Sequence, residues 1–328
     1  MKYLKMIKQM SKLLLSALIV VFPAIALWLY IIYGGMYYLD PEYPYEVWNK
    51  EFCQTDHNGN VDVLFLGDSA VNAAVLPENL SDGTYNLSLG GRTSVEAYYI
   101  LKEFLKNNEA PDACYIGFAD TGYLEDQNFY TRTLYFHRLS YEDEKEIFDN
   151  AIAFNAESIL KENYEKEWKQ YRSWSPEKYL PALFNGGFNA RYESNLANYE
   201  LIKEHKGSYM SQTYDCEKEA EMQEYTSFPV NEFYDFYMKK LLDLCTENNI
   251  TPRVIMIPMS PNIQCSMDYI ADCYIYLVSL QEYCPQMTYF YRPEGFDYND
   301  FSDYWHMNLN GATKYTAKIK EAFPEDFD

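Results

Sequence analysis

Basic residues are scarce in this chain. Its 328 residues include 27 Lys and Arg against 49 Asp and Glu, which gives a formal net charge of −22 at pH 7. A chain this acidic repels the phosphate backbone of nucleic acids, and no Lys/Arg stripe occurs beyond the N-terminus. We therefore exclude nucleic acid as a partner.

Metal-binding patterns are also missing. The four histidines are scattered, and the seven cysteines form no Cys-x-x-Cys pair and lie at no zinc spacing from a histidine. We expect neither a metal site nor a cofactor. Cys114 and Cys245 lie in apolar runs, which is typical of buried thiols. Cys265, Cys273 and Cys284 leave room for one disulfide in an extracytoplasmic setting.

One long hydrophobic run is present, from Leu13 to Tyr33, and only Ser16 interrupts it. At a rise of 1.5 Å per residue, about 21 helical residues span the ~30 Å core of a bilayer. A cleaved signal peptide is the alternative, because Ala24-Ile25-Ala26 resembles a cleavage site. The run continues past Ala26 to Tyr33, which favours an uncleaved anchor.

Charges on the two sides of this run predict its orientation. Four lysines (Lys2, Lys5, Lys8, Lys12) precede the run, and acidic residues (Asp40, Glu42, Glu46) follow it. Because positive flanks stay in the cytoplasm, we predict a single-pass protein of the cell membrane. Its expected parts are a cytoplasmic tail (1–12), a transmembrane anchor (13–35), a linker (36–60) and an extracytoplasmic domain (61–328).

Strand and helix patterns alternate along that domain. Short apolar runs predict strands at 61–66, 85–89, 113–118, 253–257 and 287–291, and helical spacing of apolar residues covers 93–107, 231–247, 267–283 and 310–323. This alternation predicts an α/β fold, with a parallel sheet covered on both faces.

Residues 120–225 break the alternation. They contain charged helical segments (141–168) followed by aromatic sequence with glycines that we interpret as loop (171–192). We expect a mainly helical insertion that lies over the sheet edge and shapes the substrate site. The alternative is a helical appendage without contact to substrate.

A serine follows the first predicted strand. Leu66-Gly67-Asp68-Ser69 places Ser69 at the carboxyl end of that strand, where α/β proteins bind ligands. Backbone N–H groups at the start of the next helix favour a developing oxyanion there. We expect Asp68 to shape the turn rather than to transfer a proton.

An acid and a histidine lie at the other end of the domain. Asp303-Tyr304-Trp305-His306-Met307-Asn308 follows the last strand. A nucleophilic serine needs a base, and the base needs an orienting carboxylate, so one loop supplies both partners of Ser69. We therefore predict a triad of Ser69, His306 and Asp303, with Asn308 as possible support.

These blocks resemble those of SGNH (GDSL-type) hydrolases. Gly67-Asp68-Ser69 and Asp303-x-x-His306 are similar to the first and last blocks, and Asn86-Leu87-Ser88-Leu89-Gly90-Gly91 to the second. The stretch 85–118 and the ending after Asp303 resemble the DltD-like branch. The resemblance covers 61–120 and 231–323. It implies a flavodoxin-like three-layer fold, an oxyanion hole formed by Ser69 and Gly91, and membrane-anchored acyl transfer.

One family block is incomplete. SGNH hydrolases place an asparagine after the third strand, and this chain has Ala119 there, within Gly117-Phe118-Ala119-Asp120. Loss of one oxyanion donor costs about 3 kcal/mol of transition-state stabilisation. Thr121 or a residue of the insertion is the expected replacement. DltD-like proteins resemble this chain in lacking that block.

The expected activity is serine-dependent transfer of an O-acyl group, with acetyl favoured, to a cell-envelope or extracellular glycopolymer, or hydrolysis from it. The resemblance implies two partners besides the membrane, a multi-pass acyl-exporting protein and a glycopolymer acceptor. The alternative function is a catalytically inactive SGNH-like protein that binds glycans or acts as a scaffold in polymer export.

Overall fold

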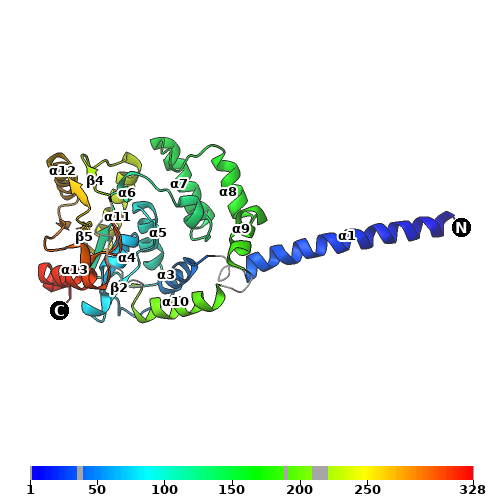
Figure 1. Ribbon diagram of the computed structural model, residues 1–328, viewed down its shortest axis with the longest axis horizontal. Coiled ribbons are helices and arrows are strands. Elements are labelled where there is room, and N and C mark those ends of the chain that lie inside the picture. The colour runs from blue at the N-terminus through cyan, green and yellow to red at the C-terminus, as the bar shows by residue number, and fades with distance from the viewer. Residues whose placement is uncertain (1, 35–39, 188–190, 209–220, 328) are drawn as a thin grey trace.

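Five parallel strands form the central sheet of the computed structural model, which describes residues 2–34, 40–187, 191–208 and 221–327 (Figure 1). The spatial order is β2-β1-β3-β5-β7, the doubly wound order of flavodoxin-like sheets. This confirms the α/β fold and the parallel sheet. The strands are β1 (Val63–Gly67), β2 (Thr84–Asn86), β3 (Ala113–Gly117), β5 (Thr251–Ile255) and β7 (Thr288–Phe290).

Helices cover both faces of the sheet because β1 is apolar on both sides. Val63 and Phe65 pack against α4 and α13, and Leu64 and Leu66 pack against α3, α5, α11 and α12. Side chains alternate between the faces of a strand, so a continuous apolar run produces three layers. These helices are α3 (Tyr43–Gln54), α4 (Ser69–Ala74), α5 (Ser94–Phe104), α11 (Glu232–Glu247), α12 (Met267–Tyr283) and α13 (Leu309–Ala322).

The segment expected to be a linker contains α3. Its Trp48, Phe52 and Cys53 are buried in the core beneath the sheet. Residues 43–54 therefore belong to the packed domain, whereas 35–39 lie outside the described residues.

The insertion contains more helix than the sequence indicated. It consists of α6 (Thr121–Leu124), the π-helix η2 (Phe129–Leu134), α7 (Tyr141–Phe154), α8 (Tyr164–Arg172), α9 (Pro176–Gly186) and α10 (Tyr192–Glu204). The loop prediction for 171–192 is wrong over α9, where Pro176 occupies the first turn and Tyr179 and Leu183 are fully buried. Packing overrides the weak local helix signal there, including Pro181 inside the helix.

The insertion meets the sheet at its β2 edge and packs against the helical layer. The N–H of Asn86 in β2 donates to the carbonyl of Lys206, just after α10 (2.9 Å). The end of the insertion also contributes β4 (Gln223–Tyr225), which pairs with β6 (Ile263–Cys265) in a separate two-stranded sheet. At β2 the end of the insertion thus lies against the sheet edge.

The N-terminal run forms one helix, α1 (Lys2–Tyr33), which extends away from the domain in Figure 1. It is long and apolar enough to cross a membrane. The described cysteines are all free thiols, so the possible disulfide among Cys265, Cys273 and Cys284 is not formed. Cys114 and Cys245 are fully buried, as expected.

Candidate active site

Ser69 begins α4 directly after β1. Asp68 caps this helix, and both of its carboxylate oxygens are occupied: Oδ1 accepts from the N–H of Ala70 (2.9 Å) and Oδ2 from the N–H of Ala119 after β3 (2.8 Å). Burial raises the pKa of Asp68, and these backbone donors oppose the rise. Asp68 thus fixes the turn and ties the ends of β1 and β3 together, as expected for a shaping residue.

Close approach of β1 and β3 requires glycine before that turn. A Cβ on Gly67 would lie 2.0 Å from the carbonyl oxygen of Gly117. With glycine at both strand ends, Ser69 is held at the point where the strand order reverses, between β1 and β3.

His306 and Asp303 lie on a tight loop between two paired backbone positions. Phe301 pairs with Met307, and the N–H of Ser302 donates to the carbonyl of His306 (2.8 Å). Asp303 Oδ1 accepts from the N–H groups of Trp305 and His306 (both 2.8 Å). The carboxylate is therefore oriented by its own loop.

The three predicted triad residues meet in one hydrogen-bonded row. Asp303 Oδ2 lies 2.7 Å from His306 Nδ1, and His306 Nε2 lies 2.8 Å from Ser69 Oγ. The Nδ1–H donates to Asp303, which leaves Nε2 to accept the serine proton. Two segments that are 237 residues apart along the chain thus bring a hydroxyl, an imidazole and a carboxylate into one row.

Electrostatics within the row favour a charged imidazolium. Burial alone would lower the pKa of His306, but the hydrogen bond and charge of Asp303, with the charges of Asp68 and Glu42, raise this pKa above its ordinary value. Burial would raise the pKa of Asp303, whereas the hydrogen bond and charge of His306 hold it below its ordinary value. Asp303 therefore stays ionised and stabilises a proton taken up by His306.

Asn308 supports the loop from outside the row. It is buried and caps α13, where its Oδ1 accepts from the N–H groups of Asn310 and Gly311 (3.0 and 3.2 Å). Its Nδ2 donates to the carbonyl of Asn299 (2.8 Å). The predicted support role is thus structural, because the side chain joins the start of the His306 loop to the helix that follows it.

The two backbone donors expected in the oxyanion hole are not used elsewhere. The N–H groups of Ser69 and Gly91 have no acceptor among the described residues. Gly91 has a φ of +66°, which favours glycine. A Cβ at this position would also lie 2.4 Å from Asn128 Nδ2. The insertion therefore packs an amide directly against the glycine expected in the oxyanion hole.

The backbone N–H of Ala119 is not available as a third donor. The Ala119 N–H is taken by Asp68. Thr121 is exposed at the start of α6 and lines a cavity of about 250 Å³ beside Trp305. Asn128 is held differently: its own N–H donates to Asp126 (2.7 Å) and its carbonyl accepts from the N–H of Arg132 (2.8 Å). Within the described part of the insertion, Asn128 provides the atoms nearest to a Cβ built on Gly91.

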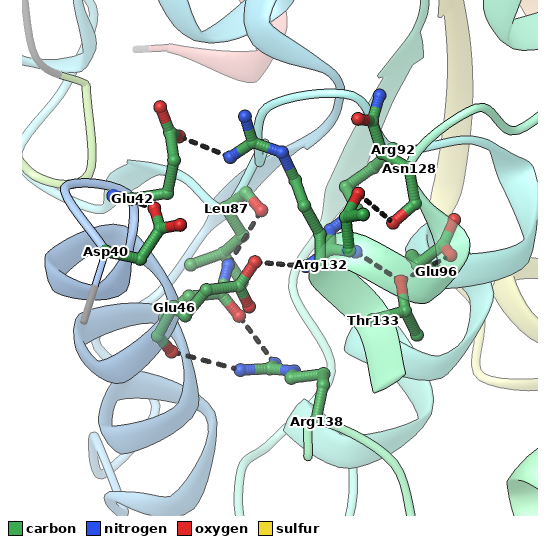
Figure 2. Close-up of polar contacts among 12 residues, drawn as sticks. Asp40, Glu42, Glu46, Leu87, Arg92, Glu96, Asn128, Arg132, Thr133 and Arg138 are labelled. Atoms are coloured by element: carbon green, nitrogen blue, oxygen red, sulfur yellow. Dashed lines mark hydrogen bonds and ion pairs between the residues drawn. The ribbon is translucent and has the colours of Figure 1, made fainter. Parts of the chain in front are cut away.

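An ion pair borders the same glycine turn. Arg132 of η2 lies 2.8 Å from Glu42, and the two side chains point toward one another in Figure 2. A Cβ on Gly90 would lie 3.3 Å from the Glu42 carboxylate. Since Glu42 also raises the pKa of His306, the start of α3 and the insertion both border the candidate site.

A buried polar network joins this border to the core (Figure 2). Arg92 is almost fully buried and donates to Glu46 of α3 and to Thr133 of η2, and Thr133 donates in turn to Glu96 of α5 (2.8 Å). Burial and the neighbouring Glu96 raise the pKa of Asp126. One cation thus connects α3, α5 and the insertion.

No family model and no curated protein matches this chain. Within the described residues, no cluster of His, Cys, Asp or Glu could hold a metal ion. The structure brings Ser69, His306 and Asp303 into one row. At the glycine turn it places Asn128 against Gly91, and the ion pair of Arg132 and Glu42 beside Gly90. No short motif marks Asn128, Arg132 or Glu42. The sequence therefore indicates only that a residue of the insertion could supply a hydrogen-bond donor.

Proposed function

We propose that this chain is a membrane-anchored serine acyltransferase or esterase of the SGNH type, in the DltD-like branch. The row from Asp303 through His306 to Ser69, with contacts of 2.7 and 2.8 Å, is the observation that carries the proposal. The flavodoxin-like strand order and the position of Ser69 after β1 support it. So does the return of the His306 loop to the first strand.

The chemistry follows from these positions. Ser69 Oγ attacks the carbonyl carbon of an ester or thioester while its proton moves to His306 Nε2, and Asp303 stabilises the imidazolium. Collapse of the tetrahedral intermediate expels the leaving group, which takes the proton from His306. An acceptor hydroxyl then gives its proton to His306 and attacks the acyl-serine, so Ser69 regains its proton and the acyl group leaves on the acceptor.

Three donors serve the oxyanion in this mechanism. The N–H groups of Ser69 and Gly91 supply two of them, and the Asn128 side-chain amide supplies the third. Asn128 then takes over the role of the asparagine that is missing at Ala119. The contact of Asn128 with Gly91 supports this assignment. One oxyanion donor of this kind contributes about 3 to 4 kcal/mol of transition-state stabilisation.

Transfer is favoured over hydrolysis because of the anchor. A helix able to cross the membrane ends at Tyr33, and Glu42 already borders the site. Ser69 would therefore work close to the outer surface of the cell membrane, next to a multi-pass partner that exports acyl groups. The proposed acceptor is a hydroxyl of a glycopolymer and the proposed acyl group is acetyl.

A serine-directed fluorophosphonate probe tests this proposal. We expect wild-type protein to be labelled, Ser69→Ala to be unlabelled, and the control Ser279→Ala to behave like wild type, because Ser279 bonds only within its own helix α12. A folded wild type that takes no label would reject the enzyme and favour the glycan-binding or scaffolding protein.

A further inference from the structure

The outer end of α1 is packed into the insertion. Ile31 is fully buried, and Leu27 and Tyr30 are partly buried in the same cluster as the helices of the insertion. The indole N–H of Trp28 donates to the carbonyl of Trp174, between α8 and α9 (3.1 Å). From Leu27 onward, one side of α1 is therefore covered by the insertion. Lipid can contact the helix on all sides only at residues before Leu27.

The part of α1 that is free of protein is too short for a bilayer. From Leu13, the first residue after Lys12, to Ala26 the helix rises about 21 Å. The hydrocarbon core is about 30 Å thick. A tilt of the helix reduces the thickness it can cross, so tilting makes the shortfall of about 9 Å larger.

Two arrangements remove this shortfall. Moving α1 outward by about 9 Å would place Lys12 and Lys8 at the depth of the hydrocarbon core, where charged groups are strongly disfavoured. Snorkelling of the lysine side chains relieves only part of that penalty. The other arrangement lowers the adjoining surface of the insertion into the membrane interface, and its feasibility depends on what that surface presents.

The surface beside α1 suits an interface. From Tyr179 to Gly186, α9 carries no charged residue, although the chain has a net charge of −22, and its Phe184 is 62% exposed. At the start of α10, Tyr192 and Leu196 are 36% and 37% exposed and lie one turn apart. Aromatic and apolar side chains of this kind concentrate at the headgroup level.

The linker ties this surface to the end of the anchor. Asn195 of α10 donates from Nδ2 to the carbonyl of Asp40 (2.9 Å). In Figure 1, α9 and the first part of α10 lie next to the end of α1, whereas α12 lies at the far side of the domain. The helical segments that carry these exposed side chains therefore lie on the side of the domain from which α1 leaves.

We propose that the C-terminal half of α9 and the first turns of α10 form a membrane-binding surface that sits in the lipid headgroup layer. Its partner is the lipid surface itself. The proposal rests on α1 being the membrane anchor, and it is independent of the chemistry at Ser69. It fixes the domain against the bilayer at two points, so that the catalytic row keeps one height and one orientation above the membrane.

Photo-crosslinking of the full chain in phospholipid nanodiscs tests the proposal. The photoreactive residue p-benzoylphenylalanine replaces Phe184 in one variant. In a second it replaces Phe22, a residue of α1 within the predicted span, and in a third Ile275, which is 67% exposed on α12. We expect lipid adducts at positions 22 and 184, with at least a tenfold excess over position 275.

The three positions distinguish the membrane anchor α1 from the proposed membrane-binding surface. Adducts at position 22 without adducts at 184 would overturn the membrane-binding surface and leave the anchor in place. Loss of adducts at both positions would overturn the anchor as well. Equal adducts at 184 and 275 would show unspecific capture of lipid and would also overturn the proposal.

Discussion

The sheet and the insertion contribute to the candidate site in different ways. The three groups of the hydrogen-bonded row come from segments that follow the sheet: Ser69 begins α4 just after β1, and Asp303 and His306 lie on the loop before α13. The border of the site comes from η2 and the start of α3, through Asn128, Arg132 and Glu42. A strand end fixes where a side chain lies from local sequence alone, whereas a border residue depends on packing between distant segments.

The largest effect is expected at the orienting carboxylate. Asp303→Asn removes the charge that holds the imidazole in the required tautomer, and we expect the rate of probe labelling to fall about 10⁴-fold. The control is Asp243→Asn. Asp243 lies on α11, and its carboxylate accepts from Tyr283 and not from a residue of the triad. A fall of less than tenfold for Asp303→Asn, in protein that remains folded, would show that the row is not a catalytic one.

The junction between the two regions should depend on Arg92. Arg92→Met leaves Glu46 without its cation in the buried network, so we expect a loss of about 3–5 kcal/mol in the free energy of unfolding. Denaturant titration measures it. Arg132→Met is the matched control, because its pair with Glu42 is partly exposed and contributes less than about 1 kcal/mol. Equal losses for the two variants would contradict the account of the junction.

Substitution of a border residue that takes part in catalysis should lower kcat and not only raise KM. For Asn128→Ala we expect kcat for an ester substrate to fall about 10²-fold with KM nearly unchanged, because an oxyanion donor acts in the transition state. The neighbouring exposed Gln127→Ala should leave both constants unchanged. An effect of Asn128→Ala on KM alone would reduce the role of the insertion to substrate binding.

The pH dependence should report the charge environment of the base. Because the pKa of His306 lies above its ordinary 6.5, the histidine is protonated and inactive as a base below that raised pKa. The labelling rate should therefore rise with pH through a midpoint above 6.5. In Asp303→Asn the residual rate should have a lower midpoint, since the main group that raises the pKa is gone. A wild-type midpoint at or below 6.5 would contradict this account.

Local sequence was sufficient to predict the sheet and the row of Ser69, His306 and Asp303. The short apolar runs predict every strand of the central sheet to within about two residues at most boundaries, because a strand buried on both faces is apolar along its length. Ser69, Asp303 and His306 are identifiable because the ends of parallel strands meet at one edge. Their convergence needs only the order of the strands, not details of packing.

Packing decided what the sequence did not predict. The sequence predicts a loop over α9 because Pro181 and two glycines weaken the helix signal. In the structure, Tyr179 and Leu183 pack this helix into the aromatic cluster of the insertion. The segment 43–54 reads as linker, yet Trp48 and Phe52 pack beneath the sheet. The contact of Asn128 with Gly91 depends on the same tertiary packing, so no local pattern reveals it.

The acyl content of the envelope polymer, in cells carrying wild type or Ser69→Ala at equal protein levels, tests the central claim most directly. Transfer through acyl-Ser69 predicts that the variant lowers acylation to the level of cells that lack the protein. An unchanged acyl content would contradict acyl transfer and leave the chain a binding or scaffolding role.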